Sequence, residues 1–299
     1  MENSTYCVIY NPLSNNKNGT AKAMELCEKL GIDERVDITT IDNYSTFFAT
    51  YADMDIIICG GDGTLNRFVN DTADIEINNK IFFSPSGTGN DFLRDLEEKD
   101  KDIIDITDYI KNLPTCSVNG KNYKFINGIG YGIDGYCCEV GDKQRAKSSD
   151  KPINYTSIAI KGLLFHYKPT TATVTVDGVT QEFKKVWIAP SMFGRFYGGG
   201  MMPTPNQSRL DPEGKLSLMV FHGTGKLKTL MIFPSLFKGE HVKHKKAITI
   251  LSGHDITVKF DSPRALQVDG ETVLGVTEYS VKSSKLSTKK IVQEETVNA

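Results

Sequence analysis

The sequence predicts an α/β fold in its first third and a β-rich fold in the remainder. In the first third, short β-branched runs alternate with segments of helical periodicity, which is typical of a mainly parallel sheet covered by helices. From about Tyr123 the predicted strands become shorter and turn residues separate them. A chain of 299 residues suits two domains, each large enough to bury its own core.

Three apolar runs are predicted to be strands of the parallel sheet, because strands covered on both faces are almost continuously apolar. These runs are residues 6–10, 55–59 and 80–84, and helical spacing follows at residues 20–30, 64–70 and 90–96. Ligands of such sheets bind beyond the carboxyl ends of the strands. We therefore expect the site in the polar turns that follow these three strands.

The second part contains a strong hairpin signal and two helical patterns. Asp177-Gly178 separates two alternating runs, and this dipeptide is favoured in tight hairpin turns. The predicted helices are residues 154–166 and 226–237, and further strands are predicted at 247–251, 255–260 and 265–268.

Composition excludes some classes of partner. The 35 basic and 37 acidic side chains give a formal charge of −2, so the chain lacks the broad cationic surface that binds nucleic acid. The six cysteines show no metal-ligand spacing, which indicates a reducing, cytoplasmic compartment. We find neither a signal-peptide pattern nor a run of roughly 20 apolar residues, so we expect any membrane contact to be peripheral.

The segment Gly60-Gly61-Asp62-Gly63-Thr64 lies directly between a predicted strand and a predicted helix. Its glycines let the backbone approach phosphate oxygens and take positive φ, and a helix start offers unpaired N–H groups to an anion. Asp62 would repel bare phosphate, so it implies an intervening Mg²⁺, a water of the metal shell or a partner hydroxyl. The segment predicts a nucleotide-phosphate site, with an ordinary glycine-rich turn as the alternative.

A second loop repeats this arrangement at residues 85–91. Ser86 and Thr88 offer hydroxyls to phosphate or ribose. Asn90 or Asp91 can cap the following helix, and Asp91 can also contact a metal-bound water. Plain helix capping is the alternative for both. Because the two loops follow strands of one predicted sheet, we expect them to form one site.

The order of these motifs resembles a known family. A GGDGT segment followed by SGTGND looks like the nucleotide-binding core of the diacylglycerol kinase catalytic-domain family, which includes bacterial lipid kinases and is related to sphingosine kinases. NAD kinases share the first motif but characteristically follow it with an Asn-Glu pair. Further matching segments come in the family's order, at residues 11–12, 197–200, 210–216, 239–241 and 269–271.

The resemblance implies a kinase that transfers the γ-phosphate of ATP, with Mg²⁺, to diacylglycerol or a related long-chain lipid alcohol. It implies a three-layer, NAD kinase-like α/β domain for ATP at residues 1–122 and a β-sandwich domain for the acceptor at residues 123–281, with catalysis in the cleft between them. The polar residues 282–299 either fray or pack back on the first domain.

The resemblance and the two loops together predict the residues of the site. Those expected to bind ATP are Asn11, Thr40, Gly60, Gly61, Asp62, Gly63, Thr64, Asn66, Ser86, Thr88 and Asp91. Asp62 and Asp91 would lie near the catalytic Mg²⁺. Glu271 is expected to be the general base that takes the proton of the acceptor hydroxyl, and Asp269 to act through orientation or metal contact. A plain surface hairpin turn is the alternative for these last two residues.

Two departures from the family pattern concern metals. A structural Mg²⁺ site is implied at Glu213 with the carbonyls of Leu210 and Lys215, where the family has Asp in place of Glu213. Cys116 takes the place of a family Asp near the catalytic metal, and a thiol is a poor magnesium ligand. Either the carboxylate network is shorter here, or Asp105 acts in its place.

The sequence leaves alternatives open. An NAD kinase-like soluble kinase and a catalytically weak nucleotide- or lipid-binding sensor remain as other functions. Two basic stretches, residues 143–151 and 238–246, are candidates for contact with anionic lipid at the inner membrane face, and ordinary solvated loops are their alternative. Apolar side chains such as Leu163, Phe165 and Phe237 are candidates for an acyl-chain groove. The acceptor and the oligomeric state, a homodimer included, stay undetermined.

Overall fold

The computed structural model describes residues 5–86, 90–97, 101–147 and 153–284. The chain divides into two units, Met1–Asn112 and Leu113–Ala299, and each is described by itself. The division falls earlier than the boundary expected after residue 122. Strands at 115–118 and 121–124 pair within the sheet of the second unit, which explains the difference. Residues 285–299, for which two placements were open, lie outside the described part of the chain.

The first unit is built on a five-stranded sheet in the order β2-β1-β3-β4-β5. The first four strands are parallel, and the short β5 runs antiparallel to β4. The strands are β1 (Tyr6–Tyr10), β2 (Glu34–Asp37), β3 (Asp55–Gly60), β4 (Ile81–Pro85) and β5 (Ile104–Asp105). All three predicted strands are therefore confirmed to within one residue at each end.

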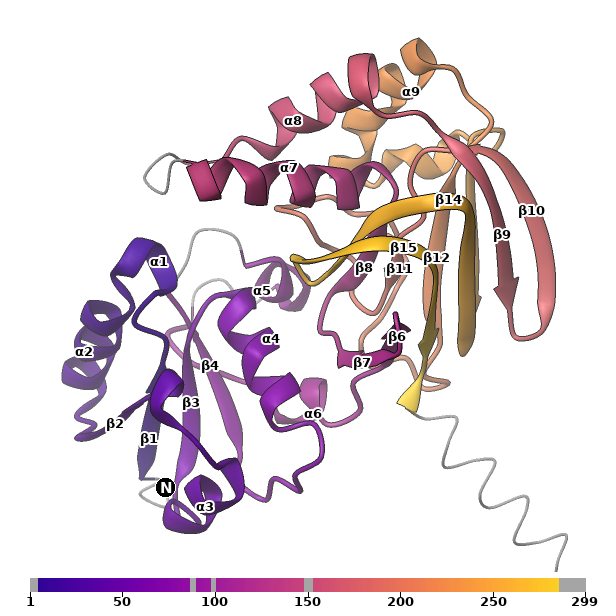
Figure 1. Cartoon of the computed structure of the whole chain (residues 1–299). Helices are drawn as coiled ribbons and strands as arrows, with labels where there is room; N and C mark the ends of the chain where they lie inside the picture. The colour runs from indigo at the N-terminus through magenta and orange to yellow at the C-terminus, as the bar shows by residue number, and fades with distance from the viewer. Residues whose placement is uncertain (1–4, 87–89, 98–100, 148–152, 285–299) are drawn as a thin grey trace, which may run out of the picture. The chain divides into compact units, whose positions relative to one another are not determined.

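Helices cover both faces of this sheet, as Figure 1 shows. Val8 and Ile57 pack with Ala23 and Leu26 of α2, whereas Phe68 of α4 packs edge-on against aromatic rings of α3. The helices are α1 (Ser14–Lys17), α2 (Gly19–Leu30), the 3₁₀ turn η1 (Ile38–Thr40), α3 (Tyr44–Thr50), α4 (Asp62–Asp71), α5 (Asp91–Leu96) and α6 (Thr107–Ile110).

The second unit is built on a ten-stranded antiparallel sheet in the order β13-β12-β11-β8-β14-β15-β6-β7, with β9 paired to both β14 and β10. Its strands are β6 (Thr115–Val118), β7 (Lys121–Lys124), β8 (Gly128–Tyr131), β9 (Thr170–Val176), β10 (Val179–Val186), β11 (Ser191–Met192), β12 (Leu216–Phe221), β13 (Ile248–Gly253), β14 (Asp255–Val268) and β15 (Glu271–Lys282). The long β14 pairs with β9 in its first half and with β8 in its second, with an irregularity between them. The two strands predicted at 255–260 and 265–268 are thus parts of one bent strand.

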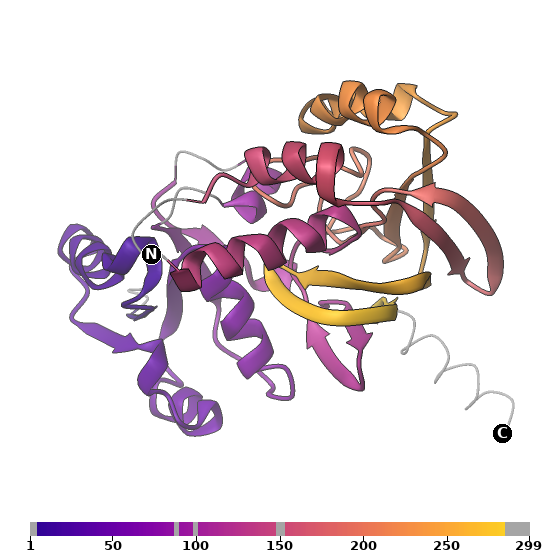
Figure 2. The ribbon, with the colours of Figure 1, turned by 45° about the horizontal axis from the view of Figure 1, so that its top comes forward.

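The helices of this unit contribute to a hydrophobic core that includes Trp187 and Leu163. Figure 2 shows the course of these helices in a second view. They are α7 (Ile133–Lys147), α8 (Tyr155–Lys161) with a π-helical continuation η2 (Gly162–His166), and α9 (Lys226–Ile232) with 3₁₀ turns η3 (Phe233–Lys238) and η4 (Glu240–Lys243). The two predicted helices are confirmed as α8–η2 and α9–η3. The helix α7 was not predicted, because two glycines and mixed charges weaken its apolar periodicity. Among the described residues, none of the helices combines the length and the apolar character needed to cross a bilayer.

Candidate active site

Four segments of the first unit meet at one edge of its sheet. Asn11 follows β1, Thr40 closes the turn after β2, Gly61 follows β3 and Ser86 follows β4. Because these four strands are parallel, their carboxyl ends lie along the same edge. Ser86 N–H donates to the Gly60 carbonyl at 2.9 Å, which joins the last two segments directly. Thr88, also expected here, lies outside the described residues.

The turn from β3 into α4 is tight for a steric reason. Gly61 is the N-cap in an extended conformation, and α4 begins at Asp62. A Cβ atom on Gly60 would come within 2.5 Å of the Thr64 side chain, and one on Gly61 would approach the Asn90 side-chain oxygen at 3.4 Å. Positive φ was expected for these glycines, and that expectation is wrong, since neither they nor Gly63 adopt it. Lack of side-chain volume, and not a left-handed backbone, is what this turn requires.

Asp62 connects the two loops. One carboxylate oxygen accepts from the Asp91 N–H at 2.8 Å, and the other accepts a longer bond from the Phe92 N–H at 3.4 Å. These two N–H groups belong to the first turn of α5, so the carboxylate caps that helix. The Asp91 side chain is buried and lies 3.7 Å from Arg94. The structure therefore places two carboxylates beside the glycine-rich turn, as the sequence predicted.

The other predicted nucleotide residues hold the loops in shape. The Asn11 side-chain oxygen accepts from the Leu13 N–H at 3.0 Å, and the Thr40 hydroxyl donates to the Asp37 carbonyl at 2.8 Å. Thr64 and Asn66 are buried in α4. The contacts of Asn11 and Thr40 are local and assign these two side chains no ligand.

In the second unit, Asp269 fixes the turn between β14 and β15. Its carboxylate accepts three backbone N–H groups, from Ile126 at 2.5 Å, Asn127 at 2.9 Å and Gly128 at 2.9 Å. Buried Arg209 binds the same segment, at the Ile126 carbonyl and the Asn127 side-chain oxygen. A carboxylate held by three N–H groups is strongly anchored, so Asp269 acts on the turn through orientation.

Gln267 connects this turn to a buried carboxylate. Its side-chain oxygen accepts from the Gly270 N–H at 2.5 Å, and its amide donates to Asp134 at 2.9 Å. Asp134 lies in the first turn of α7, and burial raises its pKa to about 6 although the bond from Gln267 acts in the opposite direction. The turn is thus supported from inside the unit as well as by its own aspartate.

Glu271 stands exposed on this supported turn. It is the first residue of β15 and pairs with Val268. The next residue, Thr272, donates its hydroxyl to Asp142 of α7 at 2.6 Å. A carboxylate that is free to approach solvent, on a backbone fixed from both sides, is suited to accept a proton at a defined position.

The sequence did not single out Asp134 or Gln267. The glycine at position 130 could have pointed to them, because only a residue without a side chain fits there. A Cβ on Gly130 would lie 1.5 Å from an Asp134 carboxylate oxygen and 2.6 Å from the Gln267 amide nitrogen. Gly128, Gly130 and Gly132 alternate before Asp134, and a strand with no side chains on one face leaves room for polar groups from its neighbours.

The loop predicted to hold a structural Mg²⁺ offers no converging oxygen ligands. Glu213 is exposed, and its carboxylate forms an ion pair with the Lys215 ammonium, which lowers the pKa of Glu213. The Lys215 carbonyl accepts from the Gln207 amide at 2.9 Å, and Asp211 accepts the Lys215 N–H at 2.7 Å. Nowhere in the described part of the chain do three acidic, His or Cys side chains gather as they would around a metal. The described contacts therefore show no preformed magnesium site in this loop, and its metal ligands stay a prediction.

Cys116 and Asp105 both have structural surroundings. Cys116 lies in β6, where burial and, to a smaller extent, the nearby Asp269 raise the pKa of its thiol to about 12. A neutral buried thiol cannot extend a carboxylate network. Asp105 accepts the N–H and the hydroxyl of Thr107 at 3.0 and 2.7 Å at the start of α6. Asp105 therefore acts as a local cap.

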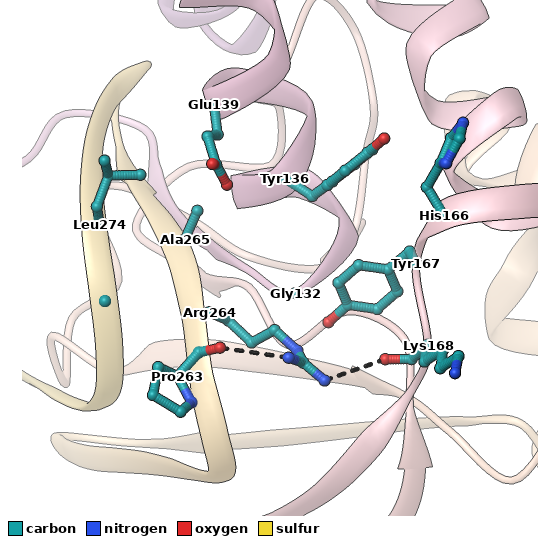
Figure 3. A pocket seen from close by; sticks show the side chains of 11 residues that line it. Gly132, Tyr136, Glu139, His166, Tyr167, Lys168, Pro263, Arg264, Ala265 and Leu274 are labelled. Atoms are coloured by element: carbon teal, nitrogen blue, oxygen red, sulfur yellow. Dashed lines mark hydrogen bonds between the residues drawn. The ribbon is translucent and has the colours of Figure 1, made fainter.

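The second unit also contains a pocket of about 440 Å³ between α7, the end of η2 and the β14–β15 hairpin (Figure 3). Arg264 crosses it, donating to the carbonyls of Pro263 and Lys168, with its guanidinium 5.5 Å from the centre of the Tyr167 ring. The pocket is lined by Gly132, Tyr136, Glu139, His166, Tyr167, Lys168, Pro263, Arg264, Ala265, Leu274 and Gly275. None of the residues predicted for the site is among them.

Comparison with known proteins identifies the family. Residues 5–118 match the diacylglycerol kinase catalytic domain, and residues 127–284 match the YegS C-terminal NAD kinase beta sandwich-like domain. The chain therefore belongs to the diacylglycerol kinase catalytic-domain family of kinases, as its motifs indicated.

Named relatives and one solved structure agree with this assignment. The chain is 26% identical to "Putative lipid kinase YtlR" of Bacillus subtilis strain 168, over 94% of this chain and 97% of that protein. It is 26% identical to a diacylglycerol kinase of the same strain, over 88% of each chain. A crystal structure described as a putative diacylglycerol kinase from Bacillus anthracis shares the fold, with a TM-score of 0.66 at 20% identity, over 94% of this chain and 92% of the other.

Proposed function

We propose that this chain is an ATP- and Mg²⁺-dependent lipid kinase that phosphorylates the hydroxyl of diacylglycerol or a related long-chain lipid alcohol. The observation that carries the proposal is the junction at Asp62. It joins a glycine-rich strand–helix turn to a second strand–helix loop at the carboxyl edge of a parallel sheet. In a member of this kinase family, such an edge is where a nucleotide binds.

The residues of the first unit fit a nucleotide and its metal. The N–H groups at the start of α4 and the space left by Gly60 and Gly61 suit phosphate oxygens. Asp62 and Asp91 are the hard oxygen ligands that Mg²⁺ prefers, and both lie at this edge. When bound, the metal would neutralise charge on the transferring phosphoryl group. The residues of the chain would orient the phosphates.

The second unit would supply the proton acceptor. Glu271 is exposed on a turn whose backbone is held by Asp269 and Gln267. Such a carboxylate can take the proton of an attacking hydroxyl, while the fixed turn limits the positions that it samples. The lipid acceptor would stay in the inner face of the membrane, with the enzyme attached peripherally.

The direct test uses purified protein with γ-labelled ATP, Mg²⁺ and mixed micelles. Separate micelles carry diacylglycerol, monoacylglycerol, a sphingoid base or ceramide, and thin-layer chromatography identifies the labelled product. A labelled lipid that Glu271→Gln no longer makes, while this variant still binds ATP, supports both the reaction and the base. NADP formed from NAD without any lipid would instead identify a soluble NAD kinase.

A catalytically weak sensor is the second candidate. It is favoured by Cys116, which is buried with a raised pKa, and by Glu213, which pairs with Lys215. The sensor predicts tight ATP binding without transfer to any of the four lipids. A measurable activity that Asp62→Ala removes while the fold stays intact would contradict it.

A further inference from the structure

Two helical segments of the second unit, α8 with η2 and α9 with η3, each bury one side and expose the other to solvent. The buried side chains of α8, η2, α9 and η3 join one hydrophobic cluster with Trp187. From these pieces the cluster takes Ile158, Ala159, Leu163, Ile232, Phe233 and Leu236. Of the side chains named as candidates for an acyl-chain groove, Leu163 is therefore a core residue.

The opposite side carries large apolar side chains that the core does not use. Met231, Leu227 and Phe165 are 82%, 75% and 72% exposed, which makes them the most exposed large hydrophobic side chains in the described part of the chain. Ile160 and Phe237 are each 39% exposed. Single exposed apolar residues are ordinary, but a group on adjoining helices indicates a contact surface.

These helical pieces are adjacent in space. The Lys226 ammonium at the start of α9 donates to the Leu164 carbonyl of η2 at 2.7 Å, and α9 packs against η2. Figure 1 shows α8 and α9 at the same end of the second unit. We call the group Ile160, Phe165, Leu227, Met231 and Phe237, with the lysines described next, the α8–α9 surface.

The charge on this surface has one sign. The segments 153–176 and 216–239 contain Lys161, Lys168, Lys226, Lys228 and Lys238 but no Asp or Glu. All five lysines are exposed. Glu139 is the acidic residue among those that line the adjoining pocket, and it is paired with Lys143. Exposed apolar groups among uncompensated lysines match the interface of an anionic bilayer, where apolar side chains insert and lysines meet lipid phosphates.

We propose that the α8–α9 surface is where this protein docks on anionic phospholipid membranes. The proposal rests on the proposed function, because a lipid acceptor requires the enzyme to reach a bilayer. Of the two basic stretches first considered, it keeps only Lys238. In those, Lys143 pairs with Glu139, Arg145 with Asp142 and Lys243 with Glu240, while residues 148–152 lie outside the described chain.

The test is sedimentation with vesicles of phosphatidylcholine alone or mixed with phosphatidylglycerol, in the absence of ATP. We expect the wild type to bind only the anionic vesicles and to release them at high salt. The variant with Phe165→Ser, Leu227→Ser and Met231→Ser should bind roughly a hundredfold more weakly, and Lys161→Glu with Lys228→Glu roughly tenfold more weakly. Val179→Ser and Lys121→Glu, exposed on other elements of the unit, should bind like the wild type.

The vesicle assay tests membrane docking, and a separate kinase assay tests catalysis. Wild-type binding by both surface variants, no binding by the wild type, or an equal loss in the two controls would overturn the proposed surface. A kinase assay on a short-chain acceptor below its micellar concentration isolates the reaction. There the surface variants should keep wild-type turnover, which also shows that they are folded. Vesicle binding without any lipid phosphorylation would leave the surface standing and reject the kinase.

Discussion

The glycine-rich turn of the first unit and the acidic turn of the second keep their shapes in opposite ways. Around Gly60 the backbone is shaped by missing side-chain volume, since a Cβ would collide with Thr64. Around Gly270 the backbone has positive φ, at 46° for Asp269 and 98° for Gly270, and it is held by the bonds of the Asp269 and Gln267 side chains. The first turn depends on space and the second on a hydrogen-bond network.

This difference predicts which substitution would disrupt each turn. A turn defined by space fails when atoms are added, whereas a turn defined by bonds fails when an acceptor is removed. The carboxylates of Asp62 and Asp269 both accept backbone N–H groups, whereas the Glu271 side chain is exposed to solvent.

The largest expected effect comes from Glu271→Gln. Because the variant keeps the size of the side chain but loses the proton acceptor, lipid phosphorylation should fall by about 10²- to 10⁴-fold. The unfolding midpoint in urea and the affinity for ATP should stay unchanged. The matched control is Glu278→Gln, an exposed residue of the same strand. Equal activity in wild type and Glu271→Gln would assign the base elsewhere.

Adding one methyl group tests the role of space in the first turn. Gly60→Ala should lower the free energy of unfolding by about 1–3 kcal/mol, because its Cβ meets Thr64 at 2.5 Å. Gly63→Ala has no atom within 4 Å of its Cβ and lies in α4, so it should be neutral or stabilise by up to about 1 kcal/mol. Urea unfolding measures both. If both variants are equally stable, the steric account is wrong.

Removing the acceptor tests the second turn. Asp269→Ala leaves three backbone N–H groups without their carboxylate and should cost about 1–3 kcal/mol of unfolding free energy. Asp269→Asn tolerates the positive φ and keeps one side-chain oxygen, so it should lose less. Chemical unfolding compares the two. An equal loss would mean that the backbone conformation, and not the acceptor, decides stability.

A further effect concerns Asp134 and depends on pH. Burial raises the pKa of Asp134 to about 6, so the folded state binds a proton that the unfolded state releases at lower pH. Stability should therefore fall as pH rises from about 4 to 6, by about 2–3 kcal/mol at most. Asp134→Asn removes this titration. Its stability relative to the wild type should rise over that range in urea unfolding, and a constant difference between the two would contradict the assignment.

Local patterns in the sequence identified much of the fold. The apolar runs at β1, β3 and β4 predicted a parallel sheet, because burial on both faces leaves few other residue types there. Asp177-Gly178 predicted the β9–β10 hairpin, since both residues take positive φ. The helix α7 was not predicted, because glycine has a low helix preference. The glycines of this helix are needed where neighbouring atoms come too close for a side chain. A Cβ on Gly135, for instance, would collide with the Ala265 carbonyl.

The two-part architecture, the family and the glycine-rich strand–helix loop could be predicted from the sequence, because strand composition and motif order are local properties of the chain. The hydrogen-bond partners of Asp62, Asp269 and Gln267 became visible in the tertiary structure alone, since they lie on other elements. These partners are Asp91, Ile126 and Asp134, respectively. The tertiary structure also separated Phe165 from Leu163, neighbours in one apolar run, into a solvent-facing and a core side chain. Packing selects which side of a helix is buried, and that selection depends on contacts between segments distant in the chain.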